Sequence, residues 1–232
     1  MMLPNTGLHI EDIKAVFIEE IEDVAGKLLD TFQDESRLFL RAVLPEVREV
    51  GPEDGVQAGI ALKAIAPDII VSPYVFRRIC SNGAILAHVL DTQPVQQSEG
   101  LTTVEIEIAL RAAIQRACTP DIFSDAVEQM RLAGRQEADL ALSLMPRLST
   151  LPRELTAHVA DVVFNGWMRQ ADRTRFGLMN AITALARDTA NPEHRWALEA
   201  LGAQIGIPTL SLKRPLRPEP AHVTKGRVPE AV

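Results

Sequence analysis

The stretch that decides the fold class is residues 36–65, SRLFLRAVLPEVREVGPEDGVQAGIALKAI. In its first part, residues 36–44, aliphatic side chains occupy every second position from Leu38 to Leu44. A period of two is typical of a strand. Residues 51–55 form a turn cluster, because proline fixes one turn dihedral, aspartate can bond its own backbone and glycine accepts a positive φ. Residues 56–65 alternate again. The stretch therefore predicts a β-hairpin.

The residues after the hairpin extend this prediction to a small sheet. Residues 69–71 are a short apolar run after Pro67, which favours a third strand. Pro73 limits the continuation of that strand, because proline cannot donate a hydrogen bond to a sheet ladder. Residues 74–80 fit either a helical turn or a continuing strand. We predict a mainly antiparallel sheet of about three strands.

The rest of the chain is predicted to be helical. Residues 9–32 place apolar side chains at three- and four-residue steps, which puts them on one stripe of a helix. From residue 102 to about 206 there are four helix-start signals, either a capping-box spacing or a proline at the first helical position. We predict about five helices here, and hence an α+β fold that ends in a helical bundle. The start signals are Thr102 with Glu105, Thr119-Pro120, Leu151-Pro152 and Asn191-Pro192.

Length and composition indicate one globular domain. A chain of 232 residues can bury a core without metals or disulfides. Two cysteines, Cys80 and Cys118, are too few for a disulfide framework and favour a reducing compartment. The chain shows neither a signal-peptide pattern nor a long apolar run, so we predict a cytoplasmic protein. Prolines and basic residues crowd the end, which predicts a domain at 1–207 and an unpacked tail at 208–232.

The charge is unevenly distributed. The net charge is −7, but the tail carries +3, which leaves −10 on residues 1–207. An acidic body argues against extensive phosphate binding, where positive potential supplies most of the affinity. It leaves room for a local basic groove. Aromatic residues make up 4% of the chain, so few rings are present to stack on nucleobases.

Residues 77–83, RRICSNG, are the densest group of chemically capable side chains. Two guanidiniums can clamp a phosphate or carboxylate, and an Asn-Gly turn exposes backbone N–H groups that can cradle an anion. Cys80 beside two arginines could have a lowered thiol pKa. Alternatively, the arginines pair with acids, Cys80 is a buried small side chain and Asn-Gly only turns the chain. With basic residues of the predicted strands, the anion-binding or nucleic-acid-binding candidates are Arg37, Arg41, Lys63, Arg77, Arg78, Asn82 and Gly83.

A second polar cluster contains Arg175, Asn180 and Thr183. On a helix that begins near Thr174, Asn180 and Thr183 share a face. This face could present an amide and a hydroxyl to a groove. It could equally form an interhelical hydrogen bond that fixes the helix register.

Signals for catalysis and metal binding are weak. The five histidines are scattered, and the pair His158 and Asp161 offers only two ligands. Neither a G-x-S-x-G elbow nor a G-x-x-x-x-G-K-[ST] loop is present. A pairing of Cys80 with His88 lacks an orienting acid. We predict no catalytic residue, cofactor or metal, and an enzyme is the least supported class.

Four stretches carry a family resemblance. In order they are residues 54–60, DGVQAGI; residues 78–83, RICSNG; residues 180–183, NAIT; and residues 192–202, PEHRWALEALG. Together they resemble the phage- and plasmid-associated family known as domain of unknown function 932, over about residues 36–206. The resemblance implies a link to mobile genetic elements and no established reaction.

Two functions are proposed as hypotheses. The first is a non-enzymatic nucleic-acid accessory, oligomeric and binding single strands, whose phosphate contacts come from the arginines and lysine above. The alternative is a protein-interaction or assembly module, such as a modulator of host defence, that docks a basic partner on its acidic first helix. The partners predicted are therefore DNA or RNA, a second copy of the chain, or a host protein, and no membrane. The acids of that helix are Glu19, Glu20, Glu22 and Asp23.

Overall fold

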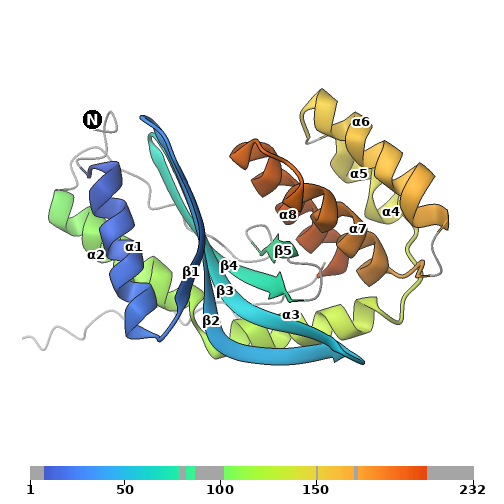
Figure 1. The fold of residues 1–232 in the computed structure, drawn as a ribbon, viewed down its shortest axis with the longest axis horizontal. Helices are drawn as coiled ribbons and strands as arrows, with labels where there is room; N and C mark the ends of the chain where they lie inside the picture. The colour runs from blue at the N-terminus through green and yellow to red at the C-terminus, as the bar shows by residue number, and fades with distance from the viewer. Residues whose placement is uncertain (1–7, 79–81, 87–101, 150, 170–171, 208–232) are drawn as a thin grey trace, which may run out of the picture.

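The computed structural model describes residues 8–78, 82–86, 102–149, 151–169 and 172–207. These residues form a five-stranded antiparallel sheet with helices on both faces (Figure 1). Each strand pairs with its neighbour in the chain, so the sheet is a simple meander. The strands are β1 (Lys27–Gln33), β2 (Arg37–Gly51), β3 (Asp54–Ile65), β4 (Asp68–Arg77) and β5 (Asn82–Ile85).

The predicted hairpin is confirmed. β2 and β3 pair in antiparallel register from Arg37 opposite Ile65 to Gly51 opposite Asp54. Glu53, in the predicted turn, has a φ of 57°. The predicted third strand is β4, which continues through Pro73 to Arg77 and so settles residues 74–77 as strand.

The predicted first helix is confirmed near its start, but its end at residue 32 and the count of about three strands are wrong. Helix α1 spans only Ile10–Asp23, and β1 follows it. The turn between them contains Ala25 at a φ of 57° and Gly26, whose backbone lies close to Ile21 and Val43. The apolar residues of β1 continue the spacing of a helix, but the segment pairs with β2 as a strand. Strand formation depends on cross-strand packing more than on local pattern. The short strand β5 is the other strand that the pattern missed.

The helix starts predicted after residue 100 are confirmed, but the helices do not form one bundle. The Thr102 and Glu105 capping box is present, Asn191 caps its helix, and Thr119 and Pro152 stand at N-cap positions. Helices α1–α3 cover one face of the sheet, and α7 and α8 cover the other (Figure 1). The remaining short helices pack outside α7. The later helices are α2 (Thr103–Ala117), α3 (Pro120–Ala133), α4 (Leu140–Ser143), α5 (Met145–Leu148), α6 (Arg153–Asp161), the π-helix η1 (Val162–Gly166), the 3₁₀-helix η2 (Trp167–Arg169), α7 (Arg175–Arg187) and α8 (Pro192–Gly206).

The π-helix η1 has a packing explanation. Leu155, Val159, Val163 and Trp167 are buried against α7 and α8 at strict four-residue spacing. On a helix of 3.6 residues per turn such a row drifts around the axis, whereas the wider turn of a π-helix reduces the drift. The apolar row therefore keeps facing the core. Phe164, one residue past Val163, faces outward.

Some predictions fall on residues that the structure does not describe. They concern Cys80, His88, the linker at 91–100 and the tail at 208–232. Within the described parts of the chain, each helix is too short or too polar to span a bilayer.

Candidate functional site

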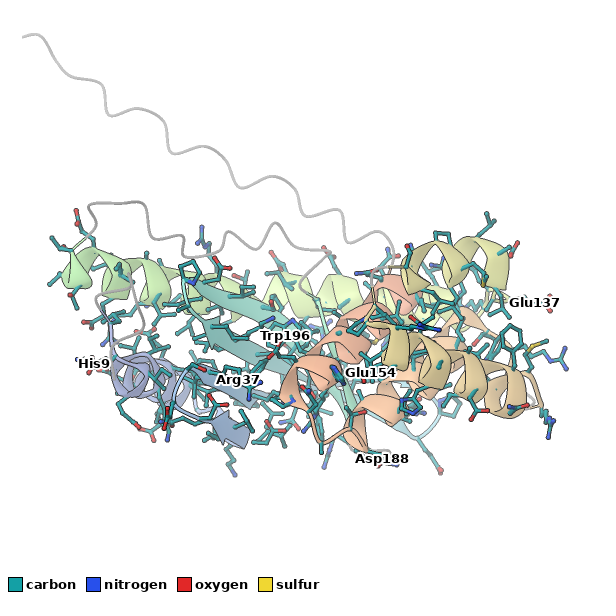
Figure 2. All side chains as sticks on the ribbon, turned by 90° about the horizontal axis from the view of Figure 1, so that it is seen from above. His9, Arg37, Glu137, Glu154, Asp188 and Trp196 are labelled. Carbon is teal, nitrogen blue, oxygen red and sulfur yellow. The ribbon has the colours of Figure 1, made fainter. Side chains whose placement is uncertain are left out.

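Arg37, the first of the predicted anion-binding residues, is engaged by acids. Its guanidinium binds Asp34 through Nε at 2.8 Å and Nη2 at 2.6 Å, and Glu193 of α8 through Nη1 at 3.0 Å. The hydrogen bond from Arg37, with help from the Ser36 backbone, lowers the pKa of Asp34 to about 2. The side chain thus joins the β1–β2 turn to α8. Figure 2 shows Arg37 lying beside this helix.

Arg41 belongs to a buried ionic cluster, which we define as Asp30 of β1, Arg41 of β2, and Arg195 and Glu199 of α8. Arg41 is 2% exposed and Glu199 is 1% exposed, and their closest N–O distance is 2.8 Å. Arg41 also binds Asp30 at 3.1 Å, while Arg195 binds Asp30 at 2.7 Å and Glu199 at 3.3 Å. Burial raises the pKa of Glu199, against the opposing effect of the two guanidiniums. The two guanidiniums and the two carboxylates cancel in charge. Their ion pairs connect α8 to β1 and β2.

Tyr74 of β4 lies beside this cluster and explains one glycine of the predicted site. Its side chain is buried, its hydroxyl meets no hydrogen-bond partner among the described residues, and burial followed by the charge of Glu199 raises its pKa. A Cβ atom at Gly83 would overlap the Tyr74 hydroxyl oxygen. The ring is rigid and enclosed, so Gly83 is required for space. The structural alternative for this glycine is thereby favoured, while the Asn82 side chain lies outside the described residues.

Of the remaining basic candidates, Arg77 forms an ion pair, whereas Lys63 and Arg78 do not pair with a carboxylate of the described residues. Arg77 makes a two-pronged ion pair with Asp54, with both N–O distances at 2.7 Å, and its guanidinium lies 5.6 Å from the centre of the Phe176 ring. Lys63 is half-buried, and Arg78 is exposed. Among the described residues, no carboxylate pairs with Lys63 or Arg78. The structure therefore does not assemble the predicted residues into one open basic groove.

The second polar cluster lies mostly inside the protein. The buried Thr183 hydroxyl donates to the Met179 carbonyl at 3.0 Å within its own helix. A Cβ atom at Gly202 of α8 would overlap the Thr183 methyl group, so these two residues mark a close approach of α7 and α8. The amide oxygen of Asn180 is buried and meets no donor in the part of the chain that the structure describes.

Arg175, the third member of that cluster, links three segments. Its Nη2 donates to the Ile205 carbonyl at 2.7 Å and its Nη1 to the Gln136 side chain at 3.2 Å. Burial and the nearby Arg147 lower its pKa from the ordinary arginine value. It contributes positive charge that no carboxylate of the described residues pairs with.

The acids of the first helix are partly occupied. Arg111 of α2 binds Glu19 at 2.7 Å and Glu20 at 2.8 Å. Glu22 and Asp23 are exposed. Two of the four acids on which the alternative hypothesis depended are therefore engaged within the chain, although a single guanidinium offsets only part of their charge.

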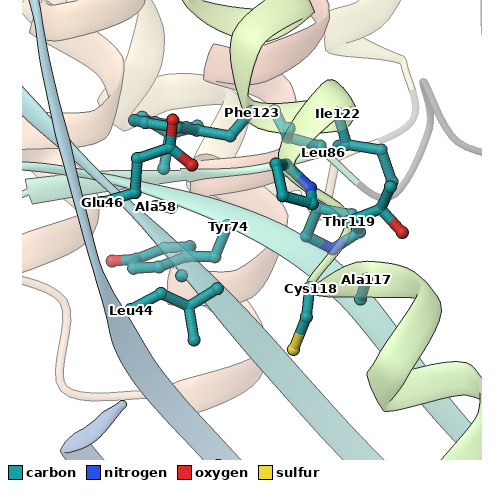
Figure 3. A pocket seen from close by; sticks show the side chains of 14 residues that line it. Leu44, Glu46, Ala58, Tyr74, Leu86, Ala117, Cys118, Thr119, Ile122 and Phe123 are labelled. Carbon is teal, nitrogen blue, oxygen red and sulfur yellow. The ribbon is translucent and has the colours of Figure 1, made fainter. Parts of the chain in front are cut away.

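Cys118 is the cysteine that the structure describes, and its surroundings do not favour a reactive thiol. Cys118 lines a small hollow between the sheet and the α2–α3 junction, where Thr119 and Glu46 also lie (Figure 3). The space in which the centre of a water molecule fits is about 20 Å³. This is enough for one or two waters. Burial, followed by the charge of Glu20, raises the pKa of the Cys118 thiol to about 11, so it stays protonated at neutral pH. Among the residues that the structure describes, no three His, Cys, Asp or Glu side chains are grouped as metal ligands.

The most open apolar surface lies at a place that the sequence analysis did not single out. We call it the helical end: residues 131–175, which run from the last residues of α3 to the first of α7. Leu142 is 73% exposed, Met145 54% and Phe164 52%, and Leu132 and Met168 are also exposed. Figure 2 shows this end on the right, marked by Glu137. These exposed large apolar side chains make the helical end the candidate interaction surface.

Several arginines of the helical end differ from those of the sheet, although Arg131 pairs with Glu128 at 3.5 Å. Arg173 donates to the Met168 carbonyl at 2.9 Å, and Arg147 to the Ser143 carbonyl at 2.7 Å. In the described residues no carboxylate pairs with Arg135, Arg169 or Arg173. Residues 131–175 contain seven arginines against five acids, whereas residues 1–130 contain ten basic residues against 21 acids. The helical end therefore combines apolar side chains with positive charge on an otherwise acidic protein.

One sequence signal could have pointed to this surface. In residues 131–175 arginines outnumber acids by seven to five, and that ratio is readable from the chain. The exposure of the apolar residues was not readable, because a helical stripe looks the same whether a neighbour covers it or not.

Comparison with known proteins identifies no relative. No family model, no curated protein and no solved structure matches the chain.

Proposed function

We propose that the protein is a non-enzymatic protein-interaction or assembly module that docks a partner through its helical end. The observation that carries this proposal is the exposure of Leu142, Met145 and Phe164 in a region whose arginines outnumber its acids. Burying these apolar side chains against a partner would supply about 25 cal/mol per Å² of apolar surface. The arginines would form the polar rim and select an acidic partner.

The arrangement supports a protein partner more than a nucleic acid. Arg37, Arg41 and Arg77, the strand arginines expected to contact phosphates, are bound to carboxylates. A phosphate backbone would compete with those acids and would meet an acidic body. Aliphatic side chains and methionines find no partner on a phosphate backbone, whereas they are common in protein interfaces.

The test compares a helical-end variant with a matched surface variant. The tagged chain is cross-linked in the cells that naturally produce it, and bound proteins are quantified by mass spectrometry. Leu142→Glu with Phe164→Glu alters the helical end, and Leu28→Glu alters an exposed leucine on β1. We expect a protein partner that is lost by about tenfold or more with the first variant and kept with the second. A partner list that both variants leave unchanged rejects the proposal.

A second measurement addresses nucleic acid. Binding of the purified chain to single- and double-stranded DNA is followed as the salt concentration rises. Tight, salt-sensitive binding that Arg169→Glu with Arg173→Glu abolishes, and that Leu142→Glu with Phe164→Glu leaves intact, would replace the proposal by the nucleic-acid hypothesis. Circular dichroism of every variant verifies that the fold is retained.

A further inference from the structure

A second open apolar surface lies at the opposite end of the molecule. Val104 and Ile108 of α2 are 64% and 62% exposed, and they stand four residues apart on the same side of the helix. We call this surface, with its surrounding acids, the acidic end. Figure 1 shows α1 and α2 together at one end of the long axis and α4–α6 at the other. His9 and Glu137 mark the same two ends in Figure 2.

Acids predominate near Val104 and Ile108, whereas arginines outnumber acids at the helical end. Glu105 lies in the first turn of α2, and Glu11 and Asp12 lie in the first turn of α1. All three are exposed. The neighbouring Arg111 is already bound by Glu19, Glu20 and Glu107, so it does not offset these acids further.

The two ends are therefore complementary in apolar surface and in charge. Each presents exposed large apolar residues. Arginines outnumber acids by seven to five in residues 131–175, whereas Glu11, Asp12 and Glu105 lie in the first turns of α1 and α2. Complementary charge of this kind orients partners and raises their association rate. One molecule cannot join its own two ends, because they lie at opposite ends of its longest axis (Figure 1).

We propose that the chain self-associates head to tail, with the helical end of one copy bound to the acidic end of the next. This inference rests on the proposed function and names its partner as a second copy. A contact between two different surfaces is heterologous, so it builds an open chain of subunits or a closed ring rather than a symmetric dimer. The apolar pairs Val104 with Ile108 and Phe164 with Leu142 form its centre.

The first experiment measures the mass of the purified full-length chain by sedimentation velocity over a range of concentrations. We expect the mass to rise beyond that of a dimer as concentration increases. Raising the salt from 0.1 M to 1 M shortens the screening length from about 10 Å to about 3 Å, and we expect it to weaken the assembly. A single monomeric species at all concentrations overturns the inference.

The second experiment separates this arrangement from a symmetric dimer. Phe164→Glu with Arg169→Glu blocks the helical end, and Val104→Lys with Ile108→Lys blocks the acidic end. Each variant alone is expected to be monomeric, with association weakened by about tenfold or more. A mixture of the two is expected to form a dimer and nothing larger, because one intact surface of each kind remains. A dimer that either variant retains by itself, or a mixture that forms no complex, contradicts head-to-tail assembly.

The basic tail offers a competing occupant for the acidic end. Residues 208–232 carry +3, so a variant that ends at residue 207 is measured in parallel. Self-association that appears only after this deletion assigns the acidic end to the tail and overturns the inference for the full chain. If the purified chain is monomeric while Leu142→Glu with Phe164→Glu still removes a cellular partner, the proposed function stands and only the self-association is rejected.

Discussion

The sheet half and the helical end use arginine in opposite ways. In the sheet half, Arg37, Arg41 and Arg77 are each held by carboxylates at 2.6–3.1 Å, so their charge is neutralised within the fold. At the helical end, Arg173 donates to a main-chain carbonyl, and no carboxylate of the described residues neutralises its charge. The number of arginines in a segment therefore says little about whether their charge is available to a partner. What matters is whether acids from other elements reach them.

The largest expected effect tests the buried ionic cluster. Arg41→Met leaves Glu199 buried with only Arg195 beside it, and breaking a buried ion pair in this way costs about 3–5 kcal/mol. Urea unfolding should therefore show a lower midpoint with an unchanged slope. The double variant Arg41→Met with Glu199→Leu removes both charges and should recover most of the loss. A loss below about 1 kcal/mol in the single variant would show that water reaches the cluster.

A glycine in each region gives the next comparison. Gly83→Ala places a methyl group against the enclosed Tyr74 hydroxyl, and overpacking of this kind costs about 1–3 kcal/mol. Gly166→Ala, in η1, meets no atom within 4 Å and should stabilise the protein by about 0.5–1 kcal/mol. Thermal unfolding of both variants checks the difference. Equal melting temperatures would mean that Tyr74 moves aside without cost.

The helical end should tolerate loss of its charge. Arg173→Gln removes one hydrogen bond to the Met168 carbonyl on an exposed surface and should change the free energy of unfolding by less than about 0.5 kcal/mol. The same experiment on Arg41 provides the contrast. If Arg173→Gln were as costly as Arg41→Met, the arginines of the two regions would not differ in role.

The smallest effect concerns a half-buried pair in the sheet half, Asp34 and Arg37. Since the Arg37 hydrogen bond lowers the pKa of Asp34 to about 2 from 3.8, the ionised form is favoured in the folded state. The resulting stabilisation is present above pH 3.8 and is lost as the pH falls through about 2. A carboxyl NMR titration should place the Asp34 midpoint near pH 2, and Arg37→Gln should move it up towards 3.8. A midpoint that Arg37→Gln leaves in place would assign the shift to the backbone of the turn.

Local pattern was enough for part of the fold. The alternation in residues 36–65 predicted the β2–β3 hairpin, and cap chemistry located the starts of α2 and α8. Both signals act between residues close in sequence, so tertiary contacts were not needed to read them. β1 was missed because its apolar residues continue the helical spacing of α1, and only pairing with β2 makes them a strand.

The candidate site depended much more on distant contacts. Arg195 and Glu199 are four residues apart on α8 and so could have been predicted as neighbours. Their partner Arg41 is 158 residues from Glu199, and nothing local links it to them. The same holds for Gly83, whose need for space comes from the Tyr74 ring of the adjacent strand.

Periodicity, charge and cap residues are local properties, so they were enough to predict an α+β chain with an acidic body, a central hairpin and capped helices. Tertiary structure alone decided which charges are neutralised, which glycines are indispensable and which apolar residues stay open to water. Those outcomes depend on the elements that fold against each residue. Arg37, Arg41 and Arg77 of the sheet were expected to bind phosphates, but they form ion pairs within the fold. The exposed apolar surfaces lie at the two ends of the molecule.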